Sequence, residues 1–137
     1  MLSHDCNIIT VAAVATGTSA VTGAALDMAG YEGALFIIRL GTPAANNSVK
    51  ITQCDTSGGS YADLTGTSAG SHATNTPIVI DVVRPIERYL KYVVTRTTST
   101  TVDIACIIQY GKKGMRPVTQ PSGTAHETFY HPVEGTA

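Results

Sequence analysis

Apolar and polar side chains alternate with a period of two along three stretches of this chain, a pattern typical of β-strands with one buried face. In residues 33–40, one face collects the apolar side chains Ala34, Phe36, Ile38 and Leu40. In residues 88–96, the corresponding side chains are Leu90, Tyr92 and Val94. In residues 101–110, we expect a core-facing row of Val102, Ile104, Cys106, Ile108 and Tyr110, with Gln109 on the opposite face.

Four weaker stretches have the composition of shorter strands. They cover residues 7–14, 20–28, 49–53 and 77–83. The links between the strands are rich in Gly, Asn, Asp and Pro, the residues that favour turns. The only helical feature expected is a single turn at residues 84–87. Seven short strands separated by turns predict an all-β fold, an antiparallel β-sandwich of jelly-roll-like form.

Composition narrows the classes of partner. With 137 residues the chain is long enough for one domain with its own core. The net charge is −1 and 14% of the residues are charged, so duplex DNA or an anionic membrane surface is not indicated. No apolar run approaches the roughly 18 residues that span a bilayer. The opening residues lack the basic start of a signal peptide. We therefore expect synthesis in the cytoplasm, with no nucleic-acid and no membrane partner.

Candidate catalytic and metal-binding groups are sparse. The three cysteines, Cys6, Cys54 and Cys106, are far apart and odd in number, which argues against a disulfide framework or a zinc site. The four histidines all fall in termini or predicted loops: His4, His72, His126 and His131. Asp55 and Asp63 flank a Gly-Ser loop, but Asp55 fits the start of a tight turn better than a calcium ligand. We expect no catalytic site, no cofactor and no bound metal, and so a protein that is not an enzyme.

The end of the chain differs from the rest. It is too broken by Pro and Gly for a helix and too poor in aliphatic residues for a strand pair. Prolines hold such a segment extended, which lowers the entropy lost when it orders on a partner. We predict a β-sandwich domain with a short N-terminal segment over residues 1–112 and an extended C-terminal arm over residues 113–137. The predicted partner-binding residues of the arm are Arg116, Pro117, Pro121, Phe129, Tyr130, His131 and Pro132.

Two alternatives apply to this arm. A disordered tail is the alternative to an arm that docks on a partner. Arg116 also belongs to a small basic group with Lys112 and Lys113. This group is either a solvated exit from the last strand or a contact for an acidic partner surface, because three charges bind nucleic acid only weakly at physiological salt.

Four segments give the chain a resemblance to a known family. They are residues 31–38 (YEGALFII), 49–53 (VKITQ), 55–64 (DTSGGSYADL) and 88–94 (RYLKYVV). In these segments the chain resembles the small cement, or decoration, proteins of tailed-bacteriophage heads, over most of the predicted domain. The resemblance implies a β-sandwich, often trimeric, seated on the outer capsid surface where major capsid subunits meet. It also implies a clamp that holds the shell against the pressure of packaged DNA.

The expected function is therefore that of a viral structural protein that binds the outer surface of an assembled capsid and stabilises it. The expected partners are the major capsid protein and further copies of the chain, with a trimer favoured. The expected location is the capsid outer surface of the virion, after synthesis in the host cytoplasm. The alternative is another virion or surface binding module, such as a connector, a fibre or a carbohydrate-binding β-sandwich.

Overall fold

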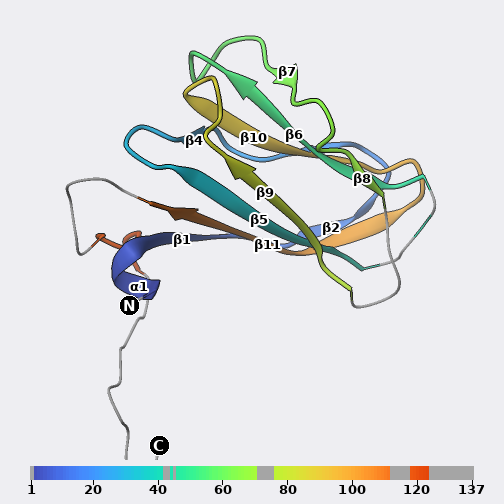
Figure 1. The fold of residues 1–137 in the computed structure, drawn as a ribbon. Coiled ribbons are helices and arrows are strands. Elements are labelled where there is room, and N and C mark those ends of the chain that lie inside the picture. The colour runs from blue at the N-terminus through green and yellow to red at the C-terminus, as the bar shows by residue number, and fades with distance from the viewer. Residues whose placement is uncertain (1, 42–43, 45, 71–75, 112–117, 124–137) are drawn as a thin grey trace, which may run out of the picture.

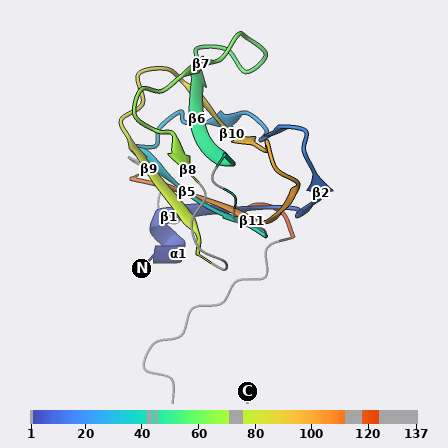
Figure 2. The ribbon, with the colours of Figure 1, turned by 90° about the vertical axis from the view of Figure 1, so that its right-hand side faces the viewer.

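The computed structural model describes residues 2–41, 44, 46–70, 76–111 and 118–123. In these residues two antiparallel β-sheets pack against each other, which confirms the predicted β-sandwich (Figure 1). A view turned by 90° shows the same two layers, with β6 and β10 above β5 and β11 (Figure 2). The helix in the described residues is α1 (Leu2–Asp5), and none there is long and apolar enough to cross a membrane.

The two sheets are called sheet A and sheet B. Sheet A contains β1 (Cys6–Val11), β2 (Val14–Gly17), β5 (Gly33–Leu40), β9 (Ile78–Val83) and β11 (Thr100–Tyr110). Sheet B contains β3 (Val21–Thr22), β4 (Leu26–Asp27), β6 (Ser48–Cys54), β7 (Ala62–Asp63), β8 (Ala69–Gly70) and β10 (Tyr89–Thr95). The sequence predicted β5 with its bounds, and it placed β6, β9, β10 and β11 to within one residue at each end. The strand predicted at 7–14 covers most of β1 and ends at the first residue of β2, and the strand predicted at 20–28 is interrupted and forms β3 and β4.

The strands pair in a nested order. The first strands, β1 and β2, pair with the last strand, β11, and β3 and β4 pair with β10. Inside these pairs, β5 pairs with β9, and β6 pairs with β7 and β8. Pairing of β11 with β5 and of β10 with β6 then joins the nested pairs into two sheets. A long hairpin wound up in this way is a jelly roll, as the sequence predicted.

The core lies between the two sheets and is built from the inward faces that the alternation predicted. Phe36, Ile38, Leu90, Tyr92 and Val94 are all buried there. The Tyr92 ring fits there because the residue against it, Gly23, has no side chain. A Cβ atom built on Gly23 would lie 2.3 Å from Tyr92 Cε1. Gly23, which directly follows β3, therefore marks a close approach of backbone to an aromatic side chain.

The predicted inward face of residues 101–110 is wrong beyond Val102. The pairing of β11 with β5 shifts in register between Val102 and Ile104. A β-bulge adds one residue to a strand, and a shift of one residue turns every later side chain to the other face. Ala105, Ile107 and Gln109 are therefore buried in place of the predicted residues. The side chains turned outward are Ile104, Cys106, Ile108 and Tyr110.

Gln109 is buried with its amide paired. Its Nε2 donates to the backbone oxygen of Asp27 at 2.7 Å, and its Oε1 accepts from Asn7 Nδ2 at 2.7 Å. Because Asp27 belongs to β4, this side chain links the last strand of sheet A to sheet B.

The single helical turn expected at residues 84–87 is also wrong. These residues form an irregular bend between β9 and β10, and Arg84 has a φ of +50°. Pro85 explains the departure, because a proline disfavours the helical conformation in the residue before it. The Arg84 backbone N–H instead donates to the Glu32 backbone oxygen at 2.7 Å.

Candidate functional site

Most of the predicted partner-binding residues lie outside the described part of the chain. These are Arg116, Pro117, Phe129, Tyr130, His131 and Pro132. Pro121 lies in the described segment 118–123, which we call the arm anchor. The predicted division at residues 112 and 113 also falls where the chain is not described. The domain boundary and the role of the arm residues therefore stay predictions.

The arm anchor packs on the chain's own first strand. Val118 is buried, and its N–H donates to the His4 backbone oxygen at 2.8 Å. The Gln120 side chain accepts from the Ile8 N–H at 3.0 Å and donates to the Cys6 backbone oxygen at 2.7 Å. Its amide thus pairs with β1 much as a peptide group of a neighbouring strand would. The contact covers part of an edge strand, where unpaired backbone groups invite association with other chains.

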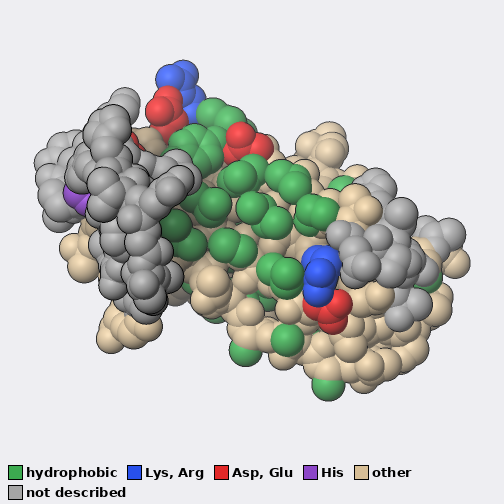
Figure 3. All heavy atoms as spheres, turned by 90° about the horizontal axis from the view of Figure 1, so that it is seen from below, with side chains coloured by type: hydrophobic (Ala, Val, Ile, Leu, Met, Phe, Trp, Pro, Cys, Tyr) green, Lys and Arg blue, Asp and Glu red, His purple; other side chains and the backbone are tan. Residues whose placement is uncertain are grey.

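The outer face of sheet A carries apolar side chains that are partly or largely exposed. Its apolar side chains are Ile8, Leu35, Ile37, Val79, Val83, Ile104, Cys106 and Ile108, which we call the sheet A face. Figure 3 shows the apolar side chains gathered over the middle of this side of the molecule. Val79 and Val83 are more than half exposed, at 55% and 58%. A contiguous apolar patch on a folded protein marks an interaction surface.

The sequence carried a signal for this face that the alternation argument missed. In β5 the run Leu35-Phe36-Ile37-Ile38 is apolar at successive positions, so both faces of the strand are apolar. β9 likewise begins Ile78-Val79-Ile80. Such runs are typical of strands covered on both sides. Here the inner face is covered by sheet B and the outer face is exposed, so the runs indicate a surface that binds something.

Polar groups lie at the margins of the sheet A face. Arg39 and Asp103 form an ion pair at 3.5 Å at one end of β5 and β11. On the edge strand β9, Asp81 accepts a hydrogen bond of 2.6 Å from the Tyr110 hydroxyl. Burial and this hydrogen bond raise the pKa of Tyr110 to about 12, so the hydroxyl keeps its proton at neutral pH. Burial also raises the pKa of the Cys106 thiol, which favours the neutral thiol near the middle of the face.

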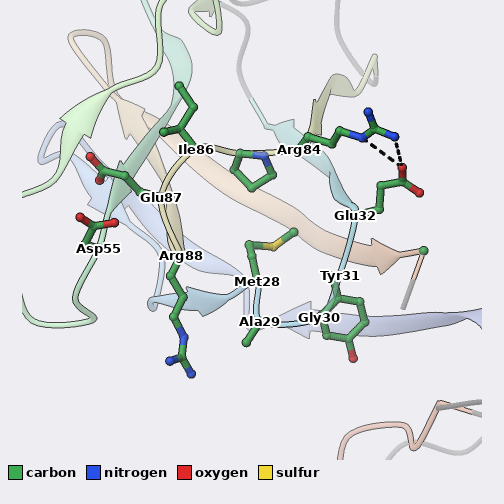
Figure 4. A pocket seen from close by; sticks show the side chains of 12 residues that line it. Met28, Ala29, Gly30, Tyr31, Glu32, Asp55, Arg84, Ile86, Glu87 and Arg88 are labelled. Carbon is green, nitrogen blue, oxygen red and sulfur yellow. Dashed lines mark hydrogen bonds and ion pairs between the residues drawn. The ribbon is translucent and has the colours of Figure 1, made fainter. Parts of the chain in front are cut away.

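A pocket opens at one end of the sandwich (Figure 4). It has a volume of about 610 Å³ and lies between the loop after β4 and the bend between β9 and β10. Met28 and Tyr31 line it from the first loop, and Ile86 and Arg88 line it from the second. Ile86 is 90% exposed, so its side chain adds an apolar contact point at this end of the molecule.

The two arginines at this pocket are already paired within the chain. Arg84 donates twice to Glu32 Oε1, at 3.0 and 3.2 Å. Arg88 forms a two-bonded pair with the Asp27 carboxylate at 2.7 and 2.9 Å, and this pair lowers the pKa of Asp27. The carboxylates of Glu32 and Asp27 take up the guanidinium donors that would otherwise bind an anionic ligand. The pocket is therefore built for loop packing more than for anion recognition.

The remaining polar candidates from the sequence are Asp63, Asp55 and the histidines. Asp63 pairs with Lys50 at 2.7 Å, and the turn after Asp55 is closed by the Gly59 N–H, which donates to the Thr56 backbone oxygen at 3.1 Å. In the described ranges, no three His, Cys, Asp or Glu side chains gather as a metal site would require. Of the four histidines, His4 is described and lies in α1, whereas His72, His126 and His131 fall outside those ranges.

Comparison of the chain with protein-family models, with curated proteins and with solved structures gives no match. The jelly-roll sandwich, the sheet A face and the arm anchor are therefore the observations on which a function has to be argued.

Proposed function

We propose that this protein is a structural protein of a virion, a cement or decoration protein that binds the outer surface of an assembled capsid and stabilises it. The observation that carries the proposal is the sheet A face, an apolar surface whose charged groups lie at its margins. Such a surface suits assembly with other proteins. Jelly rolls also occur in viral capsid domains, which supports the proposal by analogy of fold alone.

The stabilising mechanism is mass action. A protein that binds the assembled shell, and not its separate subunits, lowers the free energy of the assembled state. The jelly roll supplies a rigid body in which the two ends of the domain are held together, because β1 pairs with β11. The arm, residues 113–137, supplies the contact with the major capsid protein. About 14 extended residues beyond the arm anchor reach roughly 46 Å, enough to cross a neighbouring subunit.

The test uses shells assembled from the major capsid protein encoded beside this chain. The full chain should co-sediment with these shells and raise the temperature at which they break open. A variant that ends at Gly123 keeps Val118 and Gln120, so it should fold but fail to co-sediment. Failure of the full chain to attach would overturn the capsid function.

The arm residues can be tested separately in the full chain. Replacing Phe129 and Tyr130 by alanine should weaken attachment, because these are the predicted apolar anchors. Replacing Glu127 and Glu134 by alanine is the matched control and should leave attachment unchanged. Equal attachment of all variants, including the one that ends at Gly123, would remove the arm from the mechanism.

The alternative is another virion or surface binding module, such as a connector, a fibre or a carbohydrate-binding β-sandwich. The pocket lined by Tyr31 is the observation that bears on sugar binding, since an aromatic ring can stack on a sugar, although the Tyr31 ring is partly buried against the core. Its two guanidinium groups are already paired, Arg84 with Glu32 and Arg88 with Asp27. Screening against a glycan array distinguishes the two functions: binding there would favour the alternative.

A further inference from the structure

The pocket at the end of the sandwich has walls that hydrogen bonds fix to each other. At the start of the bend between β9 and β10, the Arg84 N–H donates to the Glu32 backbone oxygen at 2.7 Å, and the two side chains form an ion pair. At the end of the bend, the Met28 N–H donates to the Arg88 backbone oxygen at 2.9 Å. The pocket is therefore formed before a ligand binds, which lowers the entropy lost on binding.

Two carboxylates at this pocket have no cation of the chain beside them. Both guanidinium groups there are paired with other carboxylates. Asp55 and Glu87 also line the pocket, and in the described ranges neither takes part in an ion pair. Figure 4 shows them on the same side of Met28, Asp55 from the loop after β6 and Glu87 from the bend. Two like charges at one pocket attract a cation, so the pocket favours a positively charged ligand.

Apolar side chains line the pocket beside these carboxylates. Met28 and Pro85 line it together with Ile86, whose side chain is 90% exposed. Arginine and lysine carry aliphatic stems that pack on such surfaces while the charged head reaches a polar partner. An anionic ligand would be repelled, and a purely apolar ligand would bury Asp55 and Glu87 without a partner. The lining thus fits a long cationic side chain.

We propose that this pocket binds an arginine or lysine side chain of a partner protein. The charged head lies against Asp55 and Glu87, and the aliphatic stem packs along Met28 and Ile86. Complementary charge selects the partner, because the pocket adds two unpaired negative charges to a preformed apolar wall. The pocket shares no residue with the sheet A face, so this contact does not depend on capsid binding by that face or by the arm.

The test is an NMR titration of the isotope-labelled full chain with two matched probes. Nα-acetyl-arginine amide presents the cationic side chain, and Nα-acetyl-citrulline amide has nearly the same shape without the charge. The arginine probe should shift the amide signals of Gly30 and Glu87, which line the pocket. Its dissociation constant should be on the order of 1 mM, because a single side chain makes few contacts. The citrulline probe should bind at least about fivefold more weakly.

Substitutions test the two parts of the pocket separately. Asp55→Asn combined with Glu87→Gln should weaken binding of the arginine probe roughly five- to tenfold. Ile86→Ser should weaken it by a smaller factor, because only the stem loses a contact. The matched control is Asp63→Asn, which changes an exposed carboxylate outside the pocket and should leave binding unchanged. If the double variant fails to fold, the comparison of the two probes on the unmodified chain still decides.

Equal binding of the two probes, or unchanged binding in the folded double variant, would overturn the proposal. Tighter binding of putrescine than of the arginine probe would assign the pocket to a free amine and overturn the protein partner. Lys112 and Lys113 follow Gly111, which lines the pocket. If replacing both lysines by alanine tightens binding of the arginine probe, the chain's own basic group competes for the carboxylates, which would also overturn the proposal. The titration uses no shells, so the pocket and the capsid function fail independently.

Discussion

At the scale of single residues, Arg96 shows how the turns at one end of the roll are held. It is buried, and its guanidinium donates to the backbone oxygens of Ser19, Ala15 and Thr100 at 2.6, 2.9 and 2.9 Å. Gly17 lies against it, since a Cβ there would be 3.2 Å from Nη2. One side chain thus joins the link between β2 and β3 to the start of β11.

Arg96→Met should lower the free energy of unfolding by about 3 kcal/mol, because three backbone oxygens, of which that of Thr100 is buried, lose a charged donor. Arg96→Lys keeps the charge but not the planar fork, so its loss should be smaller. Urea unfolding followed by circular dichroism measures both. A free energy for Arg96→Met within about 0.5 kcal/mol of the unmodified value would contradict the role given to these bonds.

At the scale of elements, the edge of β1 depends on the arm anchor. Gln120→Ala removes the two side-chain bonds to Ile8 and Cys6, so the free energy of unfolding should fall by about 1 to 2 kcal/mol. Hydrogen exchange of the Ile8 amide should become faster. The Ile51 amide, bonded to the Thr67 hydroxyl at 3.1 Å in sheet B, is the internal control and should not change.

Gln120→Glu distinguishes the contribution of the hydrogen bond to Ile8 from that of the hydrogen bond to Cys6. A carboxylate can still accept from the Ile8 N–H, but it has no donor for the Cys6 backbone oxygen. Its loss of stability should therefore be at least as large as one hydrogen bond, while exchange at Ile8 stays slow. Fast exchange at Ile8 in the unmodified chain would show that the arm anchor does not protect this edge.

Among the strands, side-chain alternation predicted some of the buried faces and not others. The faces of β5 and β10 follow from side-chain alternation because both strands are regular over their length. In β11 the bulge inverts the pattern after Val102, and Ala105 and Gln109 give no apolar signal strong enough to reveal it. The β11 side chains of the sheet A face, Ile104, Cys106 and Ile108, were predicted as core for the same reason. Contact of Gln120 with β1 joins positions 112 apart in the chain, beyond the reach of any local pattern.

At the scale of the whole molecule, the nested pairing ranks the contacts by the chain entropy that each one costs, because contacts farther from the centre of the nest close longer loops. An inner contact joins Thr67 to Ile51, 16 positions apart, through β6. An outer contact joins Asn7 to Gln109, 102 positions apart, across β1 and β11. Closing a longer loop costs more chain entropy, so contacts near the centre of the nest should form first. Folding dominated by such distant pairings should take milliseconds to seconds.

Stopped-flow folding in urea of two variants, one lacking an inner contact and one lacking an outer contact, tests this order. Thr67→Ala removes an inner contact and should slow refolding with little change in the unfolding rate. Asn7→Ala removes an outer contact and should speed unfolding with little change in the refolding rate. Each variant must lose more than about 0.6 kcal/mol of stability for the comparison to be valid. The reverse assignment of rates would mean that the two ends of the chain meet first. The pairing of β1 with β11, and with it the sheet A face, would then form early in folding.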